Sequence, residues 1–219
     1  MRGAEHLAGI LAFLGLAVGL ALAAVASAVA LGARKSRLAG RIAQVASGGI
    51  VLYGALIVLV SALSPGRSLG LDEEKFSCQL DCDLAYSVSG VSTVKVIDGS
   101  GDPCRSRGTF YIVAVRVRSD AARVRMKPWT SPAQVVAADG RRFTISAAGQ
   151  RALDTMRGEV VPLDQEVEPG ASYVKELVFD IPDDVQRPQL LIADDDCLTR
   201  LVIGNENSLF HRKTTFRLS

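Results

Sequence analysis

The sequence predicts a two-helix transmembrane hairpin followed by an all-β domain. One observation predicts the hairpin. The runs 7–33 and 42–66 contain no charged side chain, and about 20 apolar residues are enough for a helix to cross the hydrocarbon core. A second observation predicts the β domain, because short stretches rich in β-branched residues, separated by turn residues, follow the second run.

The membrane part covers 1–66, with helices at about 7–33 and 42–64 and a loop at 34–41. A turn-rich linker at 67–75 leads to the β domain at 76–219. We expect one domain there, because its length allows a sizeable core. The chain carries a net charge of +2, and its basic excess comes from the loop at 34–41. The charge therefore gives no support for binding to nucleic acid.

The loop between the two runs sets the expected orientation. It holds four basic residues and no acidic one, namely Arg34, Lys35, Arg37 and Arg41. Loops rich in Lys and Arg stay in the cytoplasm, so both termini and the β domain are expected outside it. In the alternative, the first run is a signal peptide, because Ala26-Ser27-Ala28 resembles a cleavage site.

The apolar runs themselves limit the function. Neither contains Asp, Glu, Lys, Arg or His, which argues against a proton relay, an ion pathway or a transporter formed by this chain alone. Gly15 and Gly19 form a GxxxG pattern, which lets helices approach closely within the hairpin or against partner helices. The same glycines are also explained by the general abundance of Ala and Gly in these spans, and both interpretations stay open.

The expected strands alternate with turn signals at intervals of roughly ten residues, a pattern typical of a β-sandwich. They cover 84–97 (broken near Gly90), 110–118, 135–138, 143–145, 173–181, 190–192, 198–203 and 214–218. The second has Val113, Val115 and Val117 on one face. Asp139-Gly140 predicts a hairpin with a type I′ turn, and only 147–156 suggests a short helix.

Four segments carry a family resemblance: 108–113, 139–143, 168–172 and 177–182. In these turns and core strands the chain resembles the telokin-like, immunoglobulin-like extracytoplasmic domains of bacterial membrane proteins and lipoproteins. The resemblance covers roughly 76–219. It implies an immunoglobulin-like β-sandwich at a bacterial inner (plasma) membrane, and it brings no catalytic residues with it.

All four cysteines lie in the β domain, at Cys78, Cys82, Cys104 and Cys197. An even number in one domain suits an oxidising compartment. We expect disulfides Cys78–Cys82 and Cys104–Cys197, although four cysteines allow three pairings. On a straight strand the Cα atoms of Cys78 and Cys82 would be about 13 Å apart, so a bridge between them requires a turn at 79–81.

The Cys78-x₃-Cys82 spacing also offers a metal hypothesis. Together with two spans and a β domain, it resembles subunit II of haem-copper oxidases, in which paired thiolates bridge two coppers with the help of two histidines and a methionine. Here Tyr86 stands where that family has a histidine, and His211 is the only histidine beyond the N-terminal tail. Copper binding or redox chemistry at Cys78 and Cys82 is thus an alternative function.

Two polar segments could bind ligands. The aspartate pair at 183–184 and the aspartate triplet at 194–196 could hold calcium, but they lack EF-hand spacing and fit acidic loops. The segment 205–213 could form a binding loop through Asn205, Glu206, Asn207 and His211, or it could be a solvated loop whose polar side chains satisfy the backbone.

The sequence contains no catalytic set. A hydrolytic triad needs a base beside its nucleophile, and no G-x-S-x-G, phosphate loop or zinc spacing is present. We therefore expect a non-catalytic binding or structural module without a cofactor. Its partners would be the membrane and another envelope protein or a second copy of itself. An accessory subunit of a larger membrane complex is a further alternative.

Overall fold

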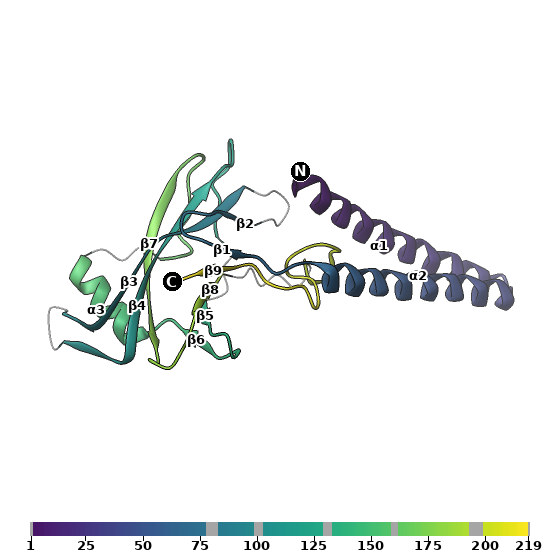
Figure 1. Ribbon diagram of the computed structural model, residues 1–219. Helices are drawn as coiled ribbons and strands as arrows, with labels where there is room; N and C mark the ends of the chain where they lie inside the picture. The colour runs from purple at the N-terminus through teal and green to yellow at the C-terminus, as the bar shows by residue number, and fades with distance from the viewer. Residues whose placement is uncertain are drawn as a thin grey trace. The chain divides into compact units, whose positions relative to one another are not determined.

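The structure is a computed structural model that describes residues 2–77, 83–98, 103–128, 133–158, 162–192 and 199–218, with backbone only for 2–6. The chain divides into two compact units (Figure 1). One contains 1–66 and 196–212, and the other contains 67–195 and 213–219. The expected fold class, two apolar helices followed by a β-sandwich, is confirmed.

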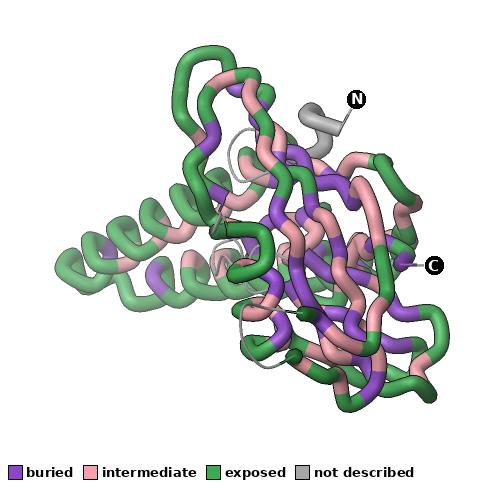
Figure 2. Tube along the Cα trace, turned by 90° about the vertical axis from the view of Figure 1, so that its left-hand side faces the viewer, coloured by how far each residue is buried: buried purple, intermediate pink, exposed green. Residues whose placement is uncertain are grey.

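The first unit is built on two long helices, α1 (Arg2–Gly32) and α2 (Ser36–Leu63). Both are long and apolar enough to cross a membrane, with mean hydropathies of 2.5 and 2.1 over the most apolar 18-residue window of the spans Leu7–Gly32 and Ser36–Leu63. Only 6% and 11% of their most apolar windows are buried, and the helices are mostly green in Figure 2. Two apolar helices without a protein covering are candidate membrane spans rather than core helices of a soluble domain.

The turn between the helices is shorter than the expected loop at 34–41. α2 begins at Ser36 rather than at Ile42, because Leu, Ala and Arg in its first turns are good helix formers. The reversal is confined to 33–35. There Arg34 adopts a φ of +57°, and the Lys35 N–H donates to the Ala30 carbonyl at 2.8 Å.

The second unit is a β-sandwich of two sheets. One has the order β2-β3-β4-β7 and the other β1-β9-β8-β5-β6. The first sheet consists of β2 (Lys75–Ser77), β3 (Leu84–Ile97), β4 (Cys104–Ser119) and β7 (Ser172–Ile181). The second consists of β1 (Ser68–Leu69), β9 (Thr215–Arg217), β8 (Gln189–Leu191), β5 (Gln134–Val136) and β6 (Arg142–Thr144).

The core lies between the sheets and follows the alternation in β4. Val113, Val115 and Val117 are fully buried, whereas Arg116 is exposed, as the strand period of two requires. In Figure 2 the central strands show the same pattern as purple alternating mainly with pink. The expected break near Gly90 is a register shift between Val88 and Gly90 in the β3–β4 pairing.

A helix covers the outer face of the first sheet. α3 (Ala147–Arg157) begins at Ser146, whose hydroxyl accepts from the Gly149 N–H at 3.3 Å, and ends at Gly158 with a φ of +72°. Leu153 packs there on Phe110 and Val178 in a second buried cluster. The helix expected at 147–156 is thus confirmed.

Two local expectations were wrong. The hairpin at Asp139-Gly140 does not have a type I′ turn, because only Gly140 of the two has a positive φ. The Gly140 N–H donates to the Ala137 carbonyl and the Ala137 N–H to the Arg141 carbonyl, both at 2.9 Å. This is a three-residue loop with glycine in the left-handed position. The strand expected at 198–203 is instead the 3₁₀ helix η1 (Thr199–Leu201) followed by turns.

Candidate binding site at one end of the sandwich

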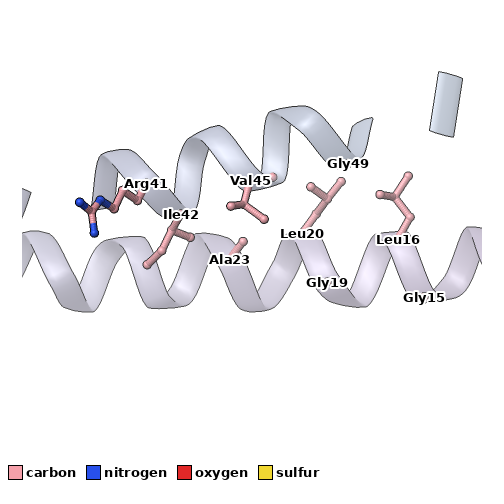
Figure 3. A pocket seen from close by; sticks show the side chains of 10 residues that line it. Gly15, Leu16, Gly19, Leu20, Ala23, Arg41, Ile42, Val45 and Gly49 are labelled. Atoms are coloured by element: carbon pink, nitrogen blue, oxygen red, sulfur yellow. The ribbon is translucent and has the colours of Figure 1, made fainter. Parts of the chain in front are cut away.

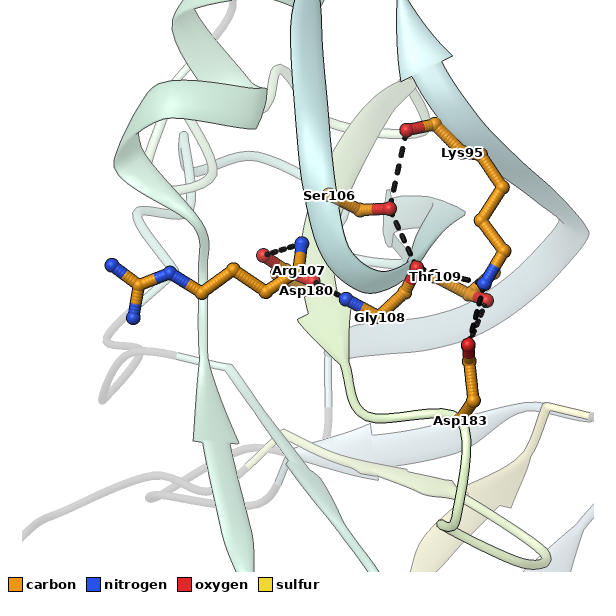
Figure 4. Close-up of polar contacts among 7 residues, drawn as sticks. All are labelled: Lys95, Ser106, Arg107, Gly108, Thr109, Asp180 and Asp183. Atoms are coloured by element: carbon orange, nitrogen blue, oxygen red, sulfur yellow. Dashed lines mark hydrogen bonds and ion pairs between the residues drawn. The ribbon is translucent and has the colours of Figure 1, made fainter.

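An irregular bulge in β4 shapes one end of the sandwich. Val94 pairs with Phe110 but Val96 pairs with Arg105, so 106–109 form extra length on β4. The carboxylate of Asp180 on β7 accepts from the Arg107 N–H at 3.0 Å and the Gly108 N–H at 3.2 Å (Figure 4). A carboxylate that accepts two backbone N–H groups compensates for the ladder bonds that a bulge loses.

A second set of polar contacts fixes the other side of the bulge. The Lys95 ammonium donates to the Gly108 carbonyl at 2.9 Å and lies 2.7 Å from Asp183 (Figure 4). The Thr109 hydroxyl donates to the same carboxylate at 2.6 Å. These contacts lower the pKa of Asp183, mainly through the hydrogen bond from Lys95 and then through that from Thr109. Asp183 therefore holds the bulge as a carboxylate at neutral pH.

Gly108 is required by close packing in the bulge. A Cβ atom at this position would lie 2.2 Å from the Ile181 carbonyl oxygen and 2.7 Å from the Pro182 Cα. Both contacts are with backbone atoms, which cannot rotate away. The bulge and the end of β7 thus fit together only without a side chain here.

The bulge forms one wall of a depression of about 490 Å³. Arg105 and Arg107 are exposed and line it together with Phe143 from β6. Cys104 and the α3 residue Ala148 complete this part of the wall. The volume lies within the range of about 300–1,000 Å³ that is usual for ligand pockets. Two guanidinium groups beside an aromatic wall make the depression cationic and partly apolar.

α3 is attached to β7 by side-chain hydrogen bonds. β7 is an edge strand, and the Gln150 side chain accepts from the Val178 N–H and donates to the Glu176 carbonyl, both at 3.0 Å. The Lys175 ammonium lies 2.8 Å from Asp154 of α3, with the two side chains 10% and 19% exposed. The helix therefore occupies backbone groups that an exposed edge would present to other chains, and it holds its own first turn at the depression.

The cysteines are only partly described. Cys104 carries a free thiol, so the structure does not support the expected Cys104–Cys197 disulfide. Cys78, Cys82 and Cys197 lie outside the described residues, and the bridge Cys78–Cys82 and the copper hypothesis stay predictions. Among the described residues, no group of three or more His, Cys, Asp or Glu side chains could hold a metal ion.

The expected binding loop belongs to the helical unit. Asn205 is buried, and its side-chain oxygen Oδ1 accepts from the backbone N–H of Asn207 at 2.8 Å. The Asn207 amide donates to the Thr199 hydroxyl at 3.2 Å, and Glu206 is half-buried. His211 Nδ1 lies 2.8 Å from the Arg212 carbonyl oxygen. These asparagine contacts stabilise the turns of the segment, and its role in binding stays a prediction.

Asp183 and Asp184, which the sequence favours as part of an acidic loop rather than a calcium site, form ion pairs. Asp183 binds Lys95, and Asp184 lies 2.9 Å from the Arg141 guanidinium. Each carboxylate thus has a cationic neighbour, which suits an ion pair better than a cation site. Residues 194–196 lie outside the described part of the chain.

Sequence reasoning missed the two arginines of the depression. Arg105 and Arg107 precede the strand that the sequence predicts at 110–118, whereas β4 begins at Cys104. The alternation of charged and small residues over 104–108 is the available signal, since a strand with one solvated face has this pattern.

No protein-family profile matches the chain, and no curated protein matches it. The chain is similar to three solved structures at low sequence identity. A conserved hypothetical protein from Bacillus anthracis has a TM-score of 0.46 and 12% identity, covering 58% of this chain and 92% of its own. The secreted protein MPT63 from Mycobacterium tuberculosis has a TM-score of 0.42 and 15% identity, covering 60% and 92%. An uncharacterised β-sandwich protein from Clostridium difficile 630 has a TM-score of 0.42 and 8% identity, covering 71% and 96%.

Proposed function

We propose that this protein is a two-span protein of a bacterial inner membrane whose telokin-like, immunoglobulin-like sandwich acts outside the cytoplasm as a non-catalytic interaction module. The observation that carries the proposal is the pair of long apolar helices with almost no protein covering, joined by a turn that is rich in positive charge. Such helices are stable in lipid, because their backbone groups are hydrogen-bonded within the helix. The Lys and Arg residues of the turn favour its location on the cytoplasmic side.

Reporter fusions test the orientation. Alkaline phosphatase folds only outside the cytoplasm. A fusion after Ser219 is therefore expected to be active, and a fusion at Arg37, in the first turn of α2, is expected to be inactive. An active fusion near Arg37 together with an inactive one after Ser219 would reverse the proposed topology.

The contact surface that we propose for the module is the depression beside the β4 bulge. Arg105 and Arg107 are exposed cations there, whereas the carboxylate of Asp180 is used by two backbone N–H groups. Charge complementarity then favours an acidic segment of another envelope protein, with Phe143 contacting its apolar side chains. Arginine and aromatic residues are also the types enriched in protein interfaces.

Photo-crosslinking in the native membrane tests this surface. A photoreactive residue at Arg107 is expected to give a crosslink that weakens at high salt and with Arg105→Gln, since exposed charge pairs are screened. The matched control places the same residue at Arg123, which is also exposed, and is expected to give no crosslink to that partner. Crosslinks from both positions, or none from Arg107, would contradict the proposal.

A further inference from the structure

The two helices of the hairpin enclose a groove of about 440 Å³ between them (Figure 3). Its walls are the side chains of Leu16 and Leu20 on α1 and of Ile42 and Val45 on α2. Its floor is opened by small residues on both helices, namely Gly15, Gly19, Ala23, Ala46 and Gly49. The groove is thus apolar along its length, and its volume is that of a ligand pocket.

The hairpin does not fill this groove with its own side chains. A Cβ atom added at Gly15 or Gly19 would meet no atom within 4 Å, and one added at Gly49 would reach only the Leu16 Cδ1 at 3.9 Å. Hydrocarbon interiors do not leave such space empty, because unfilled contacts lose dispersion energy. Another molecule therefore has to occupy it when the hairpin lies in a membrane.

One end of the groove is cationic. Arg41 lines this end (Figure 3), and Arg34, Lys35 and Arg37 lie nearby in sequence. Between Glu5 and Asp72 the sequence has no acidic residue. This stretch of the hairpin therefore offers Arg41 no carboxylate, and the exposed positive charge of Arg41 favours an anionic ligand at this end of the groove.

The length of the groove selects the kind of ligand. On α2 it runs from Arg41 to Gly49, which corresponds to about 12 Å at 1.5 Å per residue. Half of a bilayer core is about 15 Å thick. A chain that starts at Arg41 and follows the groove thus ends near the middle of the bilayer, as an acyl chain of one leaflet does.

We propose that the groove binds one anionic phospholipid, with an acyl chain between the helices and the phosphate group at Arg41. Basic pockets between membrane helices on the cytoplasmic side suit anionic headgroups. This inference rests on the membrane insertion proposed above, but it does not depend on the surface that the sandwich uses for binding.

Native mass spectrometry of the full chain, titrated in detergent with phosphatidylglycerol or phosphatidylcholine, tests the proposal. We expect one phosphatidylglycerol to bind more tightly than phosphatidylcholine. Arg41→Gln should weaken phosphatidylglycerol binding about fivefold, the factor that corresponds to about 1 kcal/mol for one basic residue near a membrane surface. Arg37→Gln, which removes a charge outside the groove lining, should have a smaller effect.

Variants that fill the groove with a side chain give a second test of the proposal. Gly19→Leu should abolish the preference, because it places a side chain in the groove. A Cβ atom at this position meets no other atom within 4 Å. Gly54→Leu, at a glycine of α2 that is also open but lies outside the groove lining, should leave the preference intact.

Three results would overturn the proposal. The first is equal binding of the two lipids, and the second is an equal loss with Arg37→Gln and Arg41→Gln. The third is a dimer of the wild-type chain that Gly19→Leu dissociates, because a second copy would then occupy the groove. A chain that alkaline carbonate releases from native membranes would instead refute the membrane insertion, independently of the lipid result.

Discussion

Replacing Asp154 by Asn tests how α3 is held on the sandwich. The Asp154 carboxylate accepts from the Lys175 ammonium at 2.8 Å and from the Gln150 amide at 2.9 Å. Only 19% of the Asp154 side chain and 10% of the Lys175 side chain are exposed. The substitution keeps the shape of the side chain but leaves the Lys175 charge largely buried without its counter-ion.

The burial of this ion pair determines how much the free energy of unfolding is expected to fall. Removing one partner of a fully buried ion pair costs about 3–5 kcal/mol, whereas exposed pairs contribute about 0–1 kcal/mol. Because both side chains keep some contact with water, we expect Asp154→Asn to lower the free energy of unfolding by about 2–3 kcal/mol. The double variant Asp154→Leu with Lys175→Met should recover most of this loss, since it buries no charge.

The pH dependence has a defined sign. Burial by itself raises the pKa of Asp154, but the hydrogen bonds from Lys175 and Gln150 and the charge of Lys175 outweigh it, so the pKa lies below its ordinary value. A carboxyl group with a lowered folded-state pKa stabilises the fold above its ordinary pKa of about 3.9. The difference between wild type and Asp154→Asn should therefore be complete at neutral pH and shrink as the pH falls through the folded-state pKa.

Urea unfolding of the detergent-solubilised chain, followed by the fluorescence of its single tryptophan, measures these differences. The matched control is Glu168→Gln, because Glu168 pairs with Arg125 at 2.6 Å while their side chains are 58% and 65% exposed. We expect the control to cost less than about 1 kcal/mol. Equal losses for Asp154→Asn and Glu168→Gln would refute the assignment of Asp154 as the buried anchor of α3.

Two further predictions concern the sandwich. Gly108→Ala should destabilise it by about 3 kcal/mol, the upper end for overpacking, because the added Cβ meets backbone atoms of Ile181 and Pro182. The control is Gly90→Ala, whose Cβ makes only an ordinary contact at 3.9 Å. Similar urea midpoints for the two variants would contradict the packing argument. Burial raises the pKa of Tyr173 to about 12, above about 10 in the unfolded chain. The contribution of Tyr173 to the free energy of unfolding should therefore be complete below pH 10 and be lost as the pH rises toward 12. Tyr173→Phe should flatten this part of the profile of stability against pH, and an unchanged alkaline profile would contradict the prediction.

Elements in which apolar residues recur at a regular spacing were predictable from the sequence. The valines at 113, 115 and 117 can be buried together only in a strand, and β4 has them on its core face. The hairpin at Asp139-Gly140 was predictable in position but not in turn type. Its loop length depends on a pairing between Ala137 and Arg141 that a dipeptide signal does not specify.

The candidate site was harder to predict because distant residues form it. The β4 bulge is stabilised by Asp180 on β7, which accepts from two N–H groups of the bulge. No local sequence pattern near Arg105 and Arg107 predicts this contact. The segment after residue 198 contains apolar residues that suit a strand. Its structure instead depends on contacts such as the Tyr53 hydroxyl donating to the Leu201 carbonyl at 2.8 Å, and tertiary contacts of this kind override local propensity.

The most direct test of the central claim is labelling of single cysteines by a membrane-impermeant maleimide in intact cells. The native cysteines are replaced by serine, and one cysteine is introduced at Arg37 or at Glu166, an exposed position of the sandwich. We predict that Glu166→Cys is labelled in intact cells and that Arg37→Cys is labelled only after the membrane is permeabilised. Labelling of Arg37→Cys but not of Glu166→Cys in intact cells, or protection of both, would contradict a hairpin that carries the sandwich outside the cytoplasm.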